Sequence, residues 1–110
     1  GITLIKSAGS IVAGNTAARN ENYGIYLEGS NGNTIEKNNA SSNYDKGLFI
    51  SNSSKNVITG NQANVNTWDG MRFWSSHKNV IKGNYTLRNA FGMVIPGVVF
   101  QNRRKSRTIL

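Results

Sequence analysis

The feature that most constrains this chain is a repeat of 23 residues. Glycines recur at spacings of 23, 23, 23 and 22 residues, at Gly1, Gly24, Gly47, Gly70 and Gly92. Asparagine, of which the chain has 17, occupies three further columns of the same period. These columns are Asn15, Asn38, Asn61 and Asn84; Asn20, Asn43, Asn66 and Asn89; and Asn33, Asn56 and Asn79, with Ser10 in the first repeat. Agreement of so many columns indicates a solenoid, in which each repeat packs against its neighbours.

Within each repeat the apolar residues alternate with polar ones, as Ile25 and Leu27 do around Tyr26. This is the two-residue period of a β-strand, and no repeat carries an apolar stripe long enough for a helix. Runs of Asn, Ser and Gly between the strands are typical of tight turns. The chain is therefore predicted to be all-β, a right-handed single-stranded parallel β-helix of about four to five coils.

The asparagine columns fit this fold. Equivalent residues of stacked strands lie roughly 4.8 Å apart, so amide side chains can hydrogen-bond along the stack as ladders. A leucine-rich repeat, the competing architecture of similar period, needs several leucine columns and usually one asparagine column. Here leucine is rare and asparagine has three columns, which favours the β-helix.

The coils are predicted to span residues 1–95. After Pro96 the columns stop, and residues 96–110 form a basic terminal segment, read either as a cap or as a frayed tail. The net charge is +8, and this segment carries half of the excess, in Arg103, Arg104, Lys105 and Arg107. An uncapped solenoid end exposes strand edges, so we expect further coils or a protein partner at the ends, and a longer parent chain.

The motif G-I-x-L-x-x-S-x-x-N-x-I-x-x-N-x-x-x-x-N stands here as GIYLEGSNGNTIEKNNASSN, residues 24–43. Over roughly residues 1–95 the chain resembles the parallel β-helix repeat family that includes NosD-type periplasmic copper-accessory proteins. The family also takes in carbohydrate-binding and sugar-hydrolase modules and microbial surface β-helices. The resemblance implies a right-handed coil, an extracytoplasmic location and often a polysaccharide ligand. It supplies no catalytic motif that can be matched here residue by residue.

Outward-pointing side chains are the candidate ligand-binding residues. They are Tyr26, Phe49, Trp68, Arg72 and Trp74, which we expect to share one side of the solenoid. Aromatic faces stack on pyranose rings, and charged side chains hydrogen-bond sugar hydroxyls, so this surface is predicted to bind carbohydrate. The competing interpretation is that the rings form a ladder that packs on itself and stabilises the sheet.

The sequence supports catalysis and metal binding poorly. Enzymes of this fold use paired carboxylates or a carboxylate with a base, and the five acids occupy five different columns. Asp69 with Arg72 is a weak catalytic candidate, and surface charge is the alternative. Copper sites in proteins usually have several His, Met or Cys ligands. In this chain His77 is the single histidine, cysteine is absent, and Met71 and Met93 fall in an apolar column. We therefore predict no metal site and no cofactor.

Three functions remain open. The first is a non-catalytic carbohydrate-binding or surface-structural module of a secreted, periplasmic or cell-surface protein. The second is a fragment of a polysaccharide lyase, epimerase or hydrolase, and the third is an architectural segment of a fibre, spike or surface layer. No apolar stretch is long enough to span a membrane. The basic tail carries no interleaved aromatics, so nucleic-acid recognition has little support.

Overall fold

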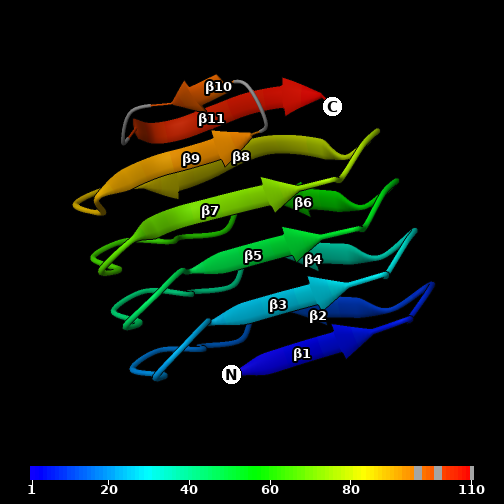
Figure 1. Ribbon diagram of the computed structural model, residues 1–110, viewed down its shortest axis with the longest axis horizontal. Coiled ribbons are helices and arrows are strands. Elements are labelled where there is room, and N and C mark those ends of the chain that lie inside the picture. The colour runs from blue at the N-terminus through cyan, green and yellow to red at the C-terminus, as the bar shows by residue number, and fades with distance from the viewer. Residues whose placement is uncertain (96–97, 101–102, 110) are drawn as a thin grey trace.

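The computed structural model describes residues 1–95, 98–100 and 103–109, with side chains described over residues 1–95. The chain winds into stacked coils, and each coil gives one strand to each of two sheets (Figure 1). No helix occurs among the described residues. The predicted fold class, an all-β parallel solenoid with 23-residue coils and asparagine ladders, is confirmed.

The first sheet has the strand order β1-β3-β5-β7-β9-β10 and the second has the order β11-β8-β6-β4-β2. Strands of the first sheet are β1 (Ile2–Ile5), β3 (Ile25–Glu28), β5 (Leu48–Ser51), β7 (Asp69–Trp74), β9 (Phe91–Ile95) and β10 (Val98–Phe100). Strands of the second sheet are β2 (Ile11–Ala13), β4 (Thr34–Glu36), β6 (Val57–Thr59), β8 (Val80–Thr86) and β11 (Arg103–Ile109).

The strand register reproduces the repeat. From β1 to β7 each residue pairs with the residue 23 positions further on, as Leu27 does with Ile50. Between β7 and β9 the offset is 22, with Met71 opposite Met93, because the last glycine spacing is one residue shorter. Each side chain therefore stacks on its own equivalent in the next coil.

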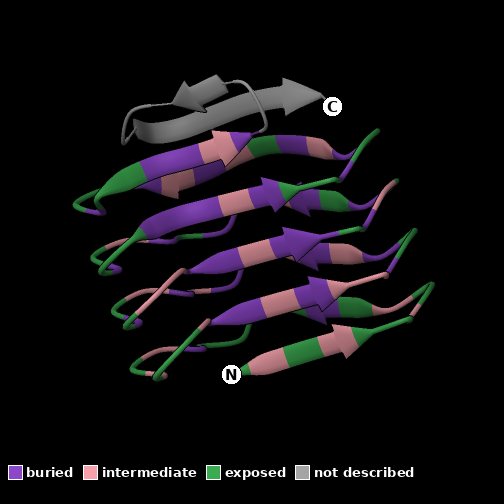
Figure 2. Cartoon of the chain, in the orientation of Figure 1, coloured by how far each residue is buried: buried purple, intermediate pink, exposed green. Residues whose placement is uncertain are grey.

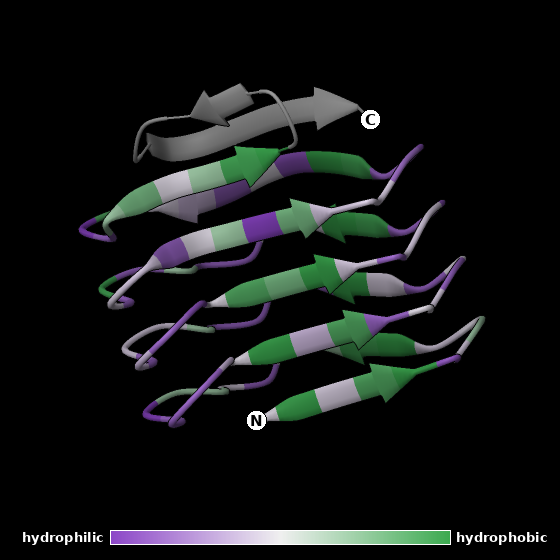
Figure 3. Ribbon diagram, viewed as in Figure 1, coloured by the Kyte–Doolittle hydropathy of each residue, from purple (hydrophilic) through white to green (hydrophobic). Residues whose placement is uncertain are grey.

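The core lies between the two sheets. Inward-facing aliphatic columns are fully buried in the middle coils, for example Ile25, Leu48 and Ile58 at 0 % exposure. Figure 2 shows this alternation of buried and accessible residues along the strands, and Figure 3 shows that apolar residues concentrate on strands while polar ones occupy the turns. Burial of these columns between coils is the main apolar contribution to stability.

Buried asparagines hold the coils in register at the turns. The Asn38 side-chain amide donates to Asn61 Oδ1 at 3.0 Å and to the Val12 carbonyl at 2.8 Å. Asn61 Oδ1 also accepts the backbone N–H of Asn38 at 3.0 Å. The same pattern recurs in the other two columns, so the side-chain amides of the buried asparagine columns are satisfied from coil to coil.

The parallel stacking stops after β9. Strand β10 pairs antiparallel with β9, and β11 pairs antiparallel with β8 with shifts in register. Strand β10 is therefore the edge strand that ends the first sheet, and β11 is the edge strand at the same end of the second sheet. The role of residues 96–110 as a cap stays a prediction from the sequence, and residues 96, 97, 101, 102 and 110 lie outside the described residues.

Candidate functional site

The outer face of the first sheet carries the predicted ligand-binding column. Tyr26 on β3, Phe49 on β5 and Arg72 on β7 stand side by side in register. Trp74 lies further along β7, opposite Ser51, and Trp68 lies in the turn just before β7. The five candidate residues therefore lie on one side of the solenoid, but they divide into two groups with different surroundings.

The first group is an aromatic cluster in the first coils. Tyr26 and Phe49 are stacked, with ring centroids 5.3 Å apart, and the Tyr23 ring contacts both at 5.2 and 5.1 Å. Lys46 Nζ lies 5.5 Å from the Tyr23 centroid and 5.4 Å from the Phe49 centroid. These half-buried rings pack on one another and on the lysine, as the competing interpretation of the column expects.

Polar groups beside this cluster also satisfy one another. The Tyr26 hydroxyl donates to Glu28 Oε2 at 3.4 Å, and the Asn52 amide donates to Glu28 Oε1 at 3.2 Å. Hydrogen bonds from Ser51 and then Asn52 lower the pKa of Glu28 from its ordinary value of 4.5. Burial and then the Glu28 carboxylate raise the pKa of Tyr26. Because these polar groups already bond to one another, this part of the face offers few hydrogen-bonding groups to a ligand.

In the second group, Trp68 and Arg72 line a cleft on the later coils, and Trp74 lies further along β7 beside Arg72. The cleft has a volume of about 450 Å³ and is lined by Asp45, Lys46, Trp68, Asp69, Arg72 and Phe91. Trp68 is 54 % exposed, and Trp74, further along β7, is 53 % exposed. Exposed indoles at a polar cleft are surfaces on which a ring-shaped ligand can stack.

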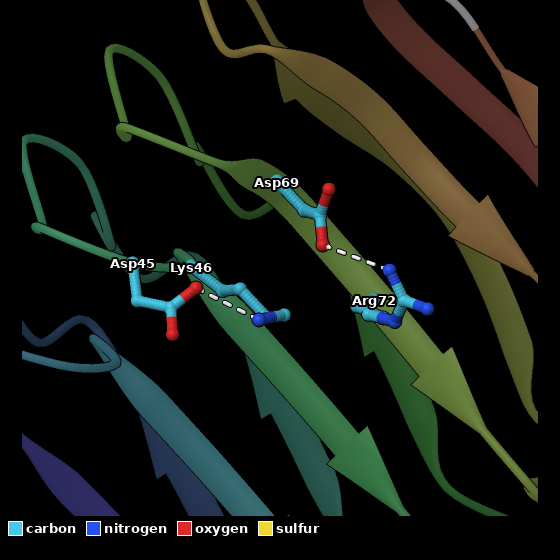
Figure 4. Close-up of polar contacts among 4 residues, drawn as sticks. All are labelled: Asp45, Lys46, Asp69 and Arg72. Atoms are coloured by element: carbon cyan, nitrogen blue, oxygen red, sulfur yellow. Dashed lines mark hydrogen bonds and ion pairs between the residues drawn. The ribbon is translucent and has the colours of Figure 1, made fainter.

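Two ion pairs lie among the residues that line this cleft (Figure 4). Lys46 Nζ lies 2.7 Å from Asp45 Oδ1, and Arg72 Nη1 lies 3.4 Å from Asp69 Oδ2. Asp69 is only 3 % exposed, whereas the Arg72 guanidinium remains accessible and lies 5.9 Å from the centre of the Trp74 ring. The cleft thus offers hydrogen-bond donors and acceptors next to an aromatic face, which is what a hydroxyl-rich ligand requires.

The structure also contains a cavity larger than this cleft, which was not predicted from the sequence. It has a volume of about 740 Å³ along the turns before the first sheet, and among its lining residues are Arg19, Glu21, Tyr44 and Val65. Tyr44 is 71 % exposed. Its position in the turn before a repeat glycine was visible in the sequence, but nothing in the pattern indicates that neighbouring turns leave a hollow between them.

Comparison with known proteins identifies a family that the chain matches. The model of the family described as periplasmic copper-binding protein (NosD) matches residues 1–102. No curated protein and no solved structure gives a significant match. Among the described residues, none forms a helix long and apolar enough to cross a bilayer.

The side chains present do not fit a copper ion. Met71 and Met93 are 0 % and 1 % exposed and pack in the apolar core, so their sulfur atoms are not available as ligands. His77 is exposed in the turn between β7 and β8, and within residues 1–95 no group of three His, Cys, Asp or Glu side chains comes together. A lone imidazole is a poor site for copper, which takes several nitrogen or sulfur ligands in proteins.

Proposed function

This chain belongs to the NosD family, and from that premise we propose that it is a non-catalytic carbohydrate-binding β-helix module of an extracytoplasmic protein. The periplasmic description of the family and the parallel β-solenoid fold both support an extracytoplasmic β-helix module. The observation that carries carbohydrate binding is the pair of half-exposed indoles on this face, Trp68 in the lining of the charged cleft and Trp74 beside Arg72 of that cleft.

The exposed surface of the two indoles can contribute to the free energy of ligand binding. An indole that is already half exposed in the unbound protein contributes apolar area to a ligand without the cost of reorganising the protein. Arg72 and Lys46 supply N–H donors and Asp45 supplies a carboxylate acceptor within one cleft, while the nearly buried Asp69 pairs with Arg72. Tyr26 and Phe49 stack on each other, and Phe49 packs against Lys46 of the cleft, so these two rings are not expected to stack on the ligand themselves.

Replacement of Trp68 and Trp74 by alanine tests this function. Each change is expected to weaken binding to the glycans recognised on a glycan array by at least about tenfold, because an exposed aromatic anchor carries a large share of the binding energy. The fold should survive, because both side chains are more than half exposed. Titration with the array hits gives the dissociation constants, and far-ultraviolet circular dichroism confirms the fold.

Tyr44→Ala is the matched control, since it removes an exposed aromatic side chain from the larger cavity instead of the cleft. It should leave binding within about twofold of the parent. Glycan binding that persists in Trp68→Ala and Trp74→Ala but disappears in Tyr44→Ala would place the ligand in the other cavity and contradict the proposal.

The alternative function is that of a polysaccharide lyase, epimerase or hydrolase fragment. The favouring observation is that Asp69 is a nearly buried carboxylate held next to Arg72 in the same cleft as Asp45. Acid and base chemistry on a sugar would need such groups. An increase in uronate absorbance or in reducing ends, lost in Asp69→Asn while binding is kept, would favour this alternative over simple binding.

A further inference from the structure

The charge of the chain is unevenly distributed along its length. Residues 1–54 contain four basic and four acidic side chains, whereas residues 55–110 contain nine basic side chains and one acidic side chain, Asp69. The whole net charge of +8 therefore belongs to the second half. Because the coils stack in chain order, this asymmetry makes one end of the solenoid basic and leaves the other end neutral (Figure 1).

The single acid of the basic half is already engaged. Asp69 pairs with Arg72, and the only other ion pair within residues 1–95 is that of Lys46 with Asp45. The remaining basic side chains of the later coils in that range are all exposed and have no carboxylate partner there: Lys55, Lys78, Lys82 and Arg88. Their charge is free to attract an anion.

Two of these lysines are stacked directly on each other. Lys55 and Lys78 hold the same turn position in consecutive coils, with φ of 58° and 56°, and the Lys55 N–H donates to the carbonyl of His77 at 3.1 Å. The same position in the first two coils is Gly9 and Gly32. Like charges at the spacing of adjacent strands repel each other, so the pair lowers stability unless an anion neutralises it.

The stacked pair lies next to the proposed sugar surface. Trp74 ends β7, and the turn that follows contains His77 and Lys78. Only three residues separate the exposed indole of Trp74 from Lys78, the second lysine of the stacked pair. Arg72, which lies over the Trp74 ring, extends the positive charge on the other side. The aromatic surface is thus flanked by cations along the basic end of the solenoid.

We propose that the ligand of this surface is an anionic polysaccharide, whose carboxylate or sulfate groups are bound by Lys55 and Lys78 while a sugar ring stacks on Trp74. This inference rests on the proposed carbohydrate-binding function and names the class of its ligand. The exposed indoles favour a sugar polymer over a phospholipid headgroup, because Trp74 and Trp68 both present ring-stacking faces and Trp68 does so in a polar cleft.

The double variant Lys55→Gly/Lys78→Gly tests the charge contribution. Glycine is compatible with this turn because the equivalent residues of the first two coils are glycines of positive φ. The probes are polygalacturonate and dextran sulfate, each measured against its neutral counterpart, methyl-esterified polygalacturonate and dextran. We expect the variant to bind the anionic probes about tenfold more weakly than the parent, and the parent's own binding to weaken as salt is raised.

The chain offers a matched control in Lys6→Gly/Lys37→Gly. Lys6 and Lys37 also have positive φ, their equivalents in other coils include Gly29 and Gly60, and their removal lowers the net charge by the same amount. This control should bind the anionic probes within about twofold of the parent, since it removes charge from the neutral end. Equal weakening in both double variants would reduce the effect to overall charge and overturn the inference.

The outcomes separate this inference from the proposed function. If neutral and anionic probes bind equally and only Trp68→Ala and Trp74→Ala weaken binding, the sugar surface stands and the anionic ligand class is wrong. If vesicles of anionic phospholipid bind through Lys55 and Lys78 while neither anionic polysaccharide binds, the two lysines bind lipid headgroups, and the proposed polysaccharide ligand is wrong.

Discussion

Replacement of Asn61 by alanine is expected to lower the free energy of unfolding by at least about 3 kcal/mol. Asn61 is fully buried in the middle of its ladder. Its Oδ1 accepts both the backbone N–H and the side-chain amide of Asn38, and its own amide donates to the Ile35 carbonyl at 2.9 Å. Alanine would leave these buried groups without their partners, and water cannot reach them.

Asn15→Ala is the control for this change because Asn15 begins the same ladder in the exposed first coil. Its side-chain amide donates to Asn38 Oδ1 at 3.1 Å. Its loss should cost only about 0.5 to 1 kcal/mol. Urea denaturation followed by circular dichroism measures both variants. Equal costs at Asn15 and Asn61 would mean that the ladder does not stabilise the buried turns.

The second large effect is expected for Gly47→Ala. A Cβ atom at Gly47 would lie 2.6 Å from the carbonyl oxygens of Ala40 and Gly70 and 2.8 Å from the Ala63 Cβ. These are backbone and short side-chain atoms of the stacked coils, which cannot move aside without breaking the register. We expect a loss of more than about 3 kcal/mol, or failure to fold, since overpacking against fixed backbone exceeds the usual range.

Gly9→Ala separates steric crowding from backbone conformation. Gly9 has φ of +68° and nothing within 4 Å of an added Cβ, so only the conformational cost of about 1 to 2 kcal/mol applies. Thermal unfolding of the two variants should show a much larger decrease in melting temperature for Gly47→Ala. A melting temperature for Gly47→Ala equal to that of Gly9→Ala would show that the coils are not packed this closely at the repeat glycine.

The sequence predicted the fold well because the same positions recur in every coil. A column such as Val12, Ile35, Ile58 and Ile81 can be read only as one inward-facing position, since successive strands must present the same face to the core. The asparagine columns likewise have one physical role, and the hydrogen bonds of Asn38, Asn61 and Asn84 follow it. Periodicity of this kind fixes both secondary structure and register at once.

The site was less predictable because it consists of side chains that differ between coils. The sequence placed Tyr26, Phe49 and Arg72 in one outward column, but it could not show that Tyr23 would pack against the first two rings. Nor could it show the hollow beside Tyr44, whose shape depends on how neighbouring turns diverge. Exposed side chains make few contacts that repeat from coil to coil, so their arrangement cannot be predicted from the periodicity of the sequence.

The most direct test of the account is a nuclear Overhauser spectrum of the isotope-labelled protein, observed at the asparagine side-chain amides. In the asparagine ladders residue i lies in contact with residue i+23, so the amide of Asn61 should show cross-peaks to the amides of Asn38 and Asn84. Cross-peaks that join Asn61 only to residues three or four positions away in the chain, with none to Asn38 or Asn84, would contradict the stacked coil and with it the surface proposed to bind the ligand.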